Sequence, residues 1–170
     1  IEELSVSVAD WFVDYVNKIL QAQNHCSIAL SGGSTPQKLN ELLTTEKYKN
    51  KIEWERLHIF FGDERFVPFD DERNNAKMAL DTLLNHVNIP KEQIHIMQNE
   101  NITPEESAEK YQNLLQEYFA LDSRQATVDG LSTFDIIFLG MGDDGHTLSL
   151  FPEEKNIIHE EKKWCHSLWL

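Results

Sequence analysis

The fold is decided by one stretch near the start of the chain, Cys26-Ser27-Ile28-Ala29-Leu30-Ser31-Gly32-Gly33-Ser34-Thr35-Pro36. Its first five residues form a short apolar run, which indicates a buried strand. A glycine-rich turn follows, and proline suits the first turn of a helix. Leucines then recur with helical spacing at Leu39, Leu42 and Leu43. The stretch therefore predicts a strand, a tight turn and a helix.

The same alternation continues along the chain. Helical spacing predicts helices over residues 8–20, 74–86 and 103–119, the last opened by an N-cap candidate, a proline and two glutamates. Apolar runs predict strands at 57–61 and 134–139, with further short strands at 94–97 and 163–170. Strands that alternate with helices indicate an α/β fold with a mostly parallel sheet and helices on both faces.

Length and composition limit the class of protein. The 170 residues suit one domain with a single core, and 41% of them are hydrophobic. The sequence contains neither an apolar run of membrane-spanning length nor a signal-peptide pattern, so we expect a cytoplasmic protein without a membrane partner. Its two cysteines, Cys26 and Cys165, are expected to be reduced thiols.

The formal net charge of −14 repels nucleic acids, so none is expected as a partner. The same field disfavours anionic metabolites at long range. A phosphorylated ligand would therefore need strong local donors.

Three unusual loops follow predicted strands, at residues 31–36, 62–75 and 140–147. In open α/β sheets, ligands collect at the carboxyl ends of the strands. We therefore expect the three loops to build one site.

The first loop, Ser31 to Pro36, suits a phosphate because glycines allow close backbone approach and a helix N-terminus presents free N–H groups. The alternative is a plain turn with a hydroxyl N-cap. The loop is not a P-loop, because no Gly-Lys-Ser/Thr follows.

The second loop is rich in charge, from Gly62-Asp63-Glu64-Arg65 to Asp70-Asp71-Glu72-Arg73-Asn74-Asn75. Such groups can surround a polar substrate, although runs of charge are usually solvated surface. The spacing lacks the calcium-loop pattern, and no zinc signature is present, so no metal is expected.

The third loop reads Gly140-Met141-Gly142-Asp143-Asp144-Gly145-His146-Thr147. Its G-x-G-x-x-G pattern makes a dinucleotide site an alternative, which the adjacent aspartates disfavour because they would face a pyrophosphate. His146 suits a general base, and Asp144 could orient it. A serine nucleophile is not indicated, since G-x-S-x-G is absent.

Together the segments 30–36, 62–68 with Arg73-Asn74, and 140–152 resemble the 6-phosphogluconolactonases, in the superfamily that includes glucosamine-6-phosphate deaminase. The resemblance implies a Rossmann-like fold of the isomerase and CoA-transferase type, hydrolysis of 6-phospho-D-glucono-1,5-lactone in the pentose phosphate pathway, and no cofactor. The sequence leaves the oligomeric state open between a monomer and a small homo-oligomer.

The resemblance implies the following roles. His146 takes a proton from water, Arg65 and Arg73 stabilise developing charge or hold the phosphate, and Asp63 and Asp144 position sugar hydroxyls or the imidazole. The phosphate would be bound by Ser31, Gly32, Gly33, Ser34 and Thr35, and the glycines of the third loop, Gly142 and Gly145, complete the binding set.

Two alternatives remain at this stage. The deaminase typically has Asp-Glu-Tyr in the second loop and a glutamate five residues beyond the histidine, where this chain has Arg65 and Phe151. A non-catalytic sugar-phosphate sensor on the same fold is the other. We expect residues 1–170 to form one sugar-phosphate-binding domain that lacks an N-terminal strand and a C-terminal segment of the family.

Overall fold

The structure, a computed structural model, describes residues 2–121, 133–160 and 163–169. Its helices and strands are, in order, α1 Glu2–Ala22, β1 Cys26–Leu30, α2 Ser34–Leu43, β2 Leu57–Phe61, α3 Asn75–Ala79, α4 Pro104–Leu121, β3 Ile136–Ile137 and α5 Lys155–Ile158. A π-helical segment, Leu80–Leu84, continues α3. Short 3₁₀ helices lie at Lys49–Lys51, Trp54–Arg56 and Lys91–Gln93.

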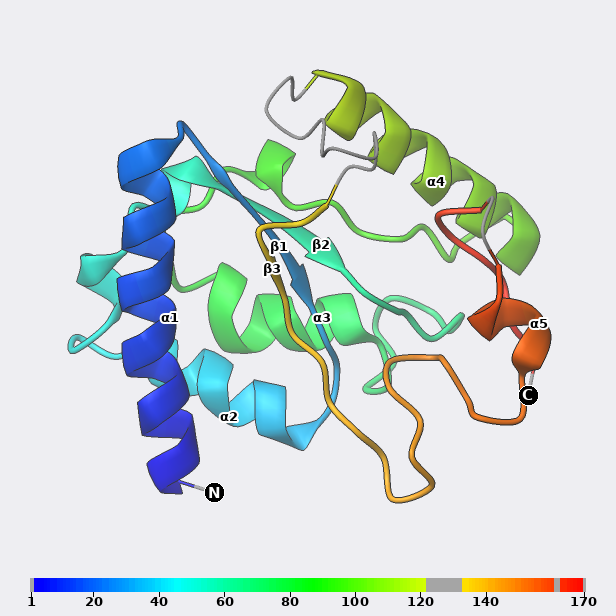
Figure 1. The fold of residues 1–170 in the computed structure, drawn as a ribbon, viewed down its shortest axis with the longest axis horizontal. Helices are drawn as coiled ribbons and strands as arrows, with labels where there is room; N and C mark the ends of the chain where they lie inside the picture. Colours follow the sequence, from blue (N-terminus) through cyan, green and yellow to red (C-terminus); the bar gives the residue numbers. More distant parts are fainter. Residues whose placement is uncertain (1, 122–132, 161–162, 170) are drawn as a thin grey trace.

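Strand β1 lies at the centre of a parallel sheet with the order β2-β1-β3 (Figure 1). Cys26 pairs with Leu57 at one end of the β1–β2 ladder, and Leu30 pairs with Phe61 at the other. All five residues of β1 are buried. The parallel sheet that the alternating pattern predicted is confirmed.

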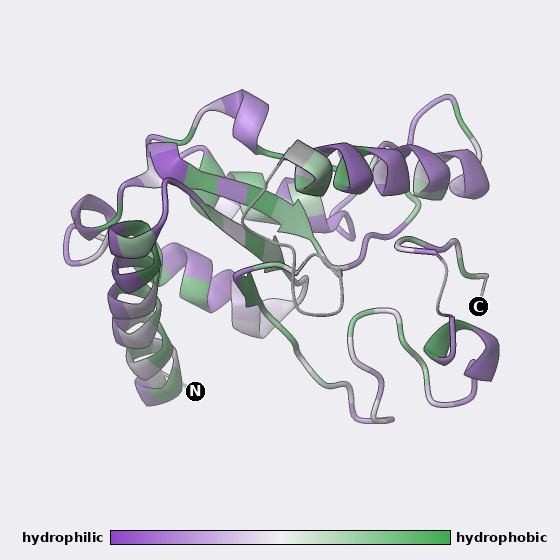
Figure 2. Cartoon of the chain, turned by 45° about the horizontal axis from the view of Figure 1, so that its top comes forward, coloured by the Kyte–Doolittle hydropathy of each residue, from purple (hydrophilic) through white to green (hydrophobic). Residues whose placement is uncertain are grey.

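Helices cover both faces of the sheet. Alternate residues of β1, among them Ile28, pack into a core with α1, α2 and α3. Ala29 points the other way and joins Phe60 in a smaller core under α4. Figure 2 shows the strands as largely hydrophobic, while α1 and α4 also carry many hydrophilic residues. The expected layers on both faces are therefore present.

Helix α4 begins with the capping pattern that the sequence indicated. The Thr103 backbone N–H donates to the Glu106 carboxylate at 2.8 Å, and the Glu106 N–H donates to the Thr103 hydroxyl at 3.2 Å. This reciprocal pair satisfies two N–H groups that the helix itself leaves free. Helix α1 likewise contains the whole predicted range 8–20.

Strand β3 is shorter than the predicted 134–139, because only Ile136 and Ile137 have full strand geometry. Backbone bonds to β1 continue on either side, from the Asp135 N–H to Ser27 and from the Phe138 N–H to Ala29. The Asp135 carboxylate also accepts hydrogen bonds from the Ser27 N–H and hydroxyl, at 2.7 and 2.8 Å. The one polar residue of this apolar run therefore fixes the start of β3 against β1.

Two predicted strands are wrong within the described residues. At 94–97 only a single bridge forms, between Ile94 and Ile59, and the next carbonyl, of His95, lies 3.3 Å from the Tyr111 hydroxyl instead of in a ladder. At 163–169 no strand forms. There the Trp164 N–H donates to a side chain of α4, and the Trp164 ring packs on Phe119. The first segment keeps one bond to the sheet, from the His95 N–H to the Ile59 carbonyl at 2.8 Å, and both segments make further contacts with α4.

Two expectations from composition can be compared with the structure. Among the described residues, no helix is long and apolar enough to cross a membrane. Cys26 and Cys165 are both free thiols, as expected.

Replacement of Tyr111 by phenylalanine tests how α4 is joined to the sheet. The buried Tyr111 hydroxyl accepts the Phe61 N–H at 2.9 Å, just where β2 ends. Burial also raises the pKa of Tyr111, so the hydroxyl stays protonated. Because the change leaves a buried N–H unpaired, we expect the free energy of unfolding to fall by about 1–3 kcal/mol in chemical denaturation. The half-exposed Tyr15 of α1 provides the control, since Tyr15→Phe should leave that free energy unchanged within about 0.5 kcal/mol.

Candidate active site

The three loops meet at one edge of the sheet, as expected from parallel strands. They line a cavity of about 390 Å³ that contains Ser31 to Pro36 of the first loop, Asp63 and Arg65 of the second, and Gly140 to Gly142, His146 and Leu148 of the third. A second cavity of about 350 Å³ shares Arg65, His146 and Leu148 with the first and continues towards α4 and residues 165–168. An imidazole and a guanidinium therefore border both spaces.

The first loop leads directly into α2. Gly33 occupies the N-cap position with φ +104°, a backbone conformation that favours glycine, and its carbonyl accepts the Gln37 N–H at 3.1 Å. Among the described residues no side chain caps this helix, and, apart from Gly33 and its two chain neighbours, none has an atom within 4 Å of the place where a Gly33 Cβ would stand. The first turn of α2 therefore borders open space at the positive end of its dipole, which suits an anion.

The amide of Asn75 joins the second loop to the first. Its Oδ1 accepts a hydrogen bond from Arg65 Nη1 at 3.1 Å, and its Nδ2 donates to the Asp63 carbonyl at 3.0 Å. The amide fills the space beside Gly32 that a side chain at that position would need, since a Cβ on Gly32 would stand 1.9 Å from the Asn75 Oδ1.

Glu64 fixes the backbone of the same region. Its Oε1 accepts the N–H groups of Arg65 and Asn75 at 2.8 and 2.7 Å, and its Oε2 accepts the Ala76 N–H at 2.9 Å. Burial raises the pKa of this carboxyl, while the three N–H donors oppose the shift. The carboxylate thus ties the end of the β2 loop to the first turn of α3.

In the third loop, His146 is held on two sides. Its Nδ1 contacts the Asp144 carboxylate, and its ring stacks on Phe151 with a centroid distance of 4.7 Å. Hydrogen bonds from the His146 ring and backbone hold the pKa of Asp144 below its ordinary value. Gly142 provides the space, because a Cβ there would lie 2.2 Å from the imidazole Cε1. With Nδ1 occupied, Nε2 is the nitrogen left for a ligand.

The third loop docks on the second through two neighbouring residues. Leu148, with φ +52°, rests against Gly62, where an added Cβ would lie 2.8 Å from its side chain. The Ser149 hydroxyl donates to the Asp63 Oδ2 at 2.7 Å. Asp63 therefore borders the first cavity with a hydrogen bond to the loop that carries His146.

The structure brings together most of the predicted site residues. Those that line the first cavity are Ser31, Gly32, Gly33, Ser34, Thr35, Asp63, Arg65, Gly142 and His146. Asp144 contacts the His146 ring, which lines the cavity. Gly145, with φ +85°, forms the turn between these two residues.

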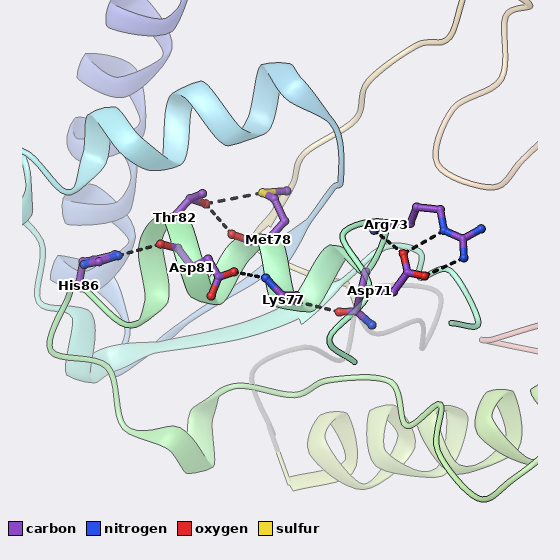
Figure 3. A network of polar contacts seen from close by, with 8 residues as sticks. Asp71, Arg73, Lys77, Met78, Asp81, Thr82 and His86 are labelled. Atoms are coloured by element: carbon purple, nitrogen blue, oxygen red, sulfur yellow. Dashed lines mark hydrogen bonds and ion pairs between the residues drawn. The ribbon is translucent and has the colours of Figure 1, made fainter. Parts of the chain in front are cut away.

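Arg73 is not brought to this group. Its guanidinium makes two hydrogen bonds to the Asp71 carboxylate, at 2.9 and 2.7 Å, and neither cavity includes it. The pairing lowers the pKa of Asp71 to about 2. In Figure 3 this pair lies beside the start of the contacts that run along α3 and the π-helical segment to His86. A role for Arg73 in binding phosphate stays a prediction without support from the geometry.

Four residues at this edge were not singled out as site residues from the sequence: Glu64, Asn75, Ser149 and Phe151. Glu64 and Asn75 lie inside the loop at 62–75, and Ser149 and Phe151 follow the loop at 140–147. Only their contacts separate them from solvated neighbours such as Glu72. Among the described residues, no group of three or more His, Cys, Asp or Glu side chains is placed to hold a metal ion.

Comparison with known proteins identifies the family. Residues 1–168 match the family described as glucosamine-6-phosphate isomerases/6-phosphogluconolactonase. The chain belongs to this family.

Similar proteins within the family carry the lactonase name. A 6-phosphogluconolactonase of Synechocystis sp. is 39% identical over 81% of this chain and 53% of its own length. A probable chloroplastic 6-phosphogluconolactonase of Oryza sativa subsp. indica is 35% identical over 96% of this chain and 50% of its own. The chain thus spans about half the length of these curated relatives.

Solved lactonase structures share the fold. The 6-phosphogluconolactonase of Trypanosoma brucei has a TM-score of 0.73 and 31% identity, covering 89% of this chain and 60% of that one. The Thermotoga maritima enzyme has a TM-score of 0.71 and 29% identity, covering 86% and 60%. The Rossmann-like arrangement inferred from the loops is therefore that of the family.

Gly142→Ala tests whether the missing side chain at 142 seats the imidazole. The new Cβ would overlap the His146 ring, so we expect the ring to leave Asp144 and its ¹H–¹⁵N imidazole signals to shift in NMR spectra. Gly140→Ala is the matched control, because a Cβ at Gly140 meets no atom within 4 Å. Equal spectra for the two variants would show that Gly142 does not set the ring position.

Proposed function

We propose that the protein hydrolyses 6-phospho-D-glucono-1,5-lactone to 6-phospho-D-gluconate, a carboxylic ester hydrolysis of the pentose phosphate pathway. One observation carries the proposal: a single 390 Å³ cavity combines the glycine-rich loop, Arg65 and a histidine paired with Asp144. An anion site beside a general base is what this substrate requires. The lactonase names of the relatives support the same choice.

In the proposed reaction His146 acts as the general base. Its Nε2 takes a proton from water as the water oxygen bonds to the lactone carbonyl carbon. Arg65, which borders the cavity with His146, stabilises the oxyanion of the tetrahedral intermediate. When the ring C–O bond breaks, the imidazolium returns the proton to the ring oxygen, which leaves the open-chain acid.

Asp144 keeps the imidazole in the state this scheme needs. Because the carboxylate faces Nδ1, it favours a proton on that nitrogen and leaves Nε2 as the acceptor. It also stabilises the imidazolium that forms during attack. Asp63, which Ser149 and Asn75 already hold, is proposed to orient a sugar hydroxyl at the cavity wall.

The phosphate is assigned to the first loop. Ser31, Ser34 and Thr35 offer hydroxyl groups beside the start of α2, and Gly33 leaves the approach to the backbone open. These local donors act against the net charge of −14. The remaining phosphate contacts are assigned to Gly32, Gly142 and Gly145 only as predictions.

The deaminase alternative is disfavoured by Phe151. This residue stands where the deaminase carries a glutamate, and its ring is stacked on His146. An apolar ring cannot move a proton. The other alternative is a non-catalytic sensor that binds the same ligand. An enzyme would hydrolyse the lactone faster than the spontaneous rate, and a sensor would not.

Other features of the function follow from the proposal or from composition. The reaction needs no cofactor, and a sugar phosphate is the proposed partner, with nucleic acid disfavoured by charge. A cytoplasmic location stays a prediction, and the rice relatives are chloroplastic by name. The state of association also stays a prediction.

His146→Ala tests the proposed reaction directly. Loss of the general base should lower kcat for 6-phosphogluconolactone by about 10²–10⁴-fold. Turnover is measured as acid release above the spontaneous rate, beside an assay for ammonia release from glucosamine 6-phosphate.

The control for this variant is His86→Ala, because His86 lies at the far end of the contacts along α3 (Figure 3) and should leave kcat unchanged. A His146→Ala enzyme within about threefold of the wild type would remove His146 from the mechanism. Ammonia release by the wild type would replace the lactonase assignment by the deaminase.

Gly33→Val tests the phosphate assignment. We expect the wild type to favour the phosphorylated lactone over gluconolactone by more than about a hundredfold in kcat/KM. The valine should reduce that ratio, because its side chain enters the open space beside the loop. Gly33→Ala shares the strain at φ +104° but adds less volume, so it should reduce the ratio less. A variant that slows both lactones alike would show that the loop is only a turn.

A further inference from the structure

We propose that Asn75 is a positioning residue that holds Arg65 and Asp63 in their working orientation, an inference that rests on the proposed function of the cavity. The side chain is 3% exposed and lies behind the cavity wall. It belongs to the first turn of α3 and lines neither cavity, so it acts through the groups it contacts.

The first argument is the freedom of Arg65. This residue is exposed, and an arginine side chain has many rotamers in water. The hydrogen bond from its Nη1 to the Asn75 Oδ1 holds the guanidinium at the wall between the two cavities. A charged group held in place before substrate arrives stabilises developing charge without reorganising.

The second argument is the two-sided character of the amide. Oδ1 accepts from Arg65 while Nδ2 donates to Asp63, to its carbonyl at 3.0 Å and its Oδ1 at 3.3 Å. A carboxylate at position 75 would place an acceptor against the Asp63 oxygens, and an alkyl group would satisfy neither neighbour. The side chain at position 75 must therefore both donate and accept a hydrogen bond, which an amide does.

The third argument is the fit against the first loop. The Asn75 amide occupies the space that a Gly32 side chain would fill, with its Oδ1, Cγ and Nδ2 at 1.9, 2.4 and 2.9 Å from the added Cβ. The same amide thus sets the spacing between the phosphate-binding loop and the Asp63–Arg65 pair.

Glu64 makes the proposal testable. Because its carboxylate holds the backbone N–H groups of Asn75 and Ala76, the start of α3 keeps its place when the amide is removed. Asn75→Ala should therefore disturb side chains at the cavity more than it disturbs the fold.

The test compares Asn75→Ala with Asn74→Ala in the full chain. Asn74 is also an asparagine, is 1% exposed, and caps α3 with its side chain, which accepts the Lys77 N–H at 2.7 Å. Measured under conditions in which the variant is fully folded, Asn75→Ala is expected to lower kcat/KM by about tenfold or more. Asn74→Ala should lower the melting temperature while the folded enzyme keeps its kcat/KM.

A double variant shows whether Asn75 acts through Arg65. In an Arg65→Ala background, Asn75→Ala should cost less in kcat/KM than it does in the wild type, because Arg65, one of the two groups that Asn75 positions, is gone. If the two losses multiply, or if Asn75→Ala is no worse than Asn74→Ala, the positioning role is overturned.

One readout does not depend on the substrate. In NMR spectra the Arg65 Nε–H signal, assigned by its loss in Arg65→Lys, should show an ordered side chain in the wild type and in Asn74→Ala, and a mobile one in Asn75→Ala. An Arg65 signal that is equally ordered in Asn75→Ala overturns the proposal even if the lactone is not the substrate. A mobile signal with no lactonase activity in the wild type supports the positioning role and rejects the proposed function.

Discussion

Parallel pairing on both sides of β1 is the constraint on which the rest of the structure depends. This strand is buried along all five residues, between β2 and β3 within the sheet and between two layers of helices across it. Parallel strands end at the same edge, so the loops that follow them must meet there. The pairing of the strands therefore brings a serine-rich turn, an arginine and a histidine together.

Elements with strong local signals could be predicted from the sequence. The periodic apolar face of α1, the cap of α4 and the apolar runs of β1 and β2 each determine one conformation. The strand predicted at 163–170 is wrong over the described residues 163–169. An apolar run has the same sequence pattern whether its backbone pairs with a strand or its side chains pack on a helix. There Trp164 meets Phe119 of α4, a contact that depends on tertiary structure alone.

The candidate site could be predicted at the level of loops, but only partly at the level of roles. His146, Arg65 and Asp63 lie in segments whose residue types are unusual after a strand, and all three border one cavity. Arg73 has the same charge as Arg65, and only the structure shows that the Arg73 guanidinium is paired with the Asp71 carboxylate. Asn75 gave no signal of its own, because its importance lies in what it contacts and in the side chain that Gly32 lacks.

The fit of Asn75 into the space beside Gly32 has an evolutionary consequence. The two residues lie on different elements and far apart in the sequence, yet they share one small volume. A lineage that acquires a side chain at position 32 must first accept a smaller residue at 75, and it then gives up the amide. A side chain at position 32 is closed off as long as Asn75 is in place, so we expect position 32 to change only after position 75 has changed.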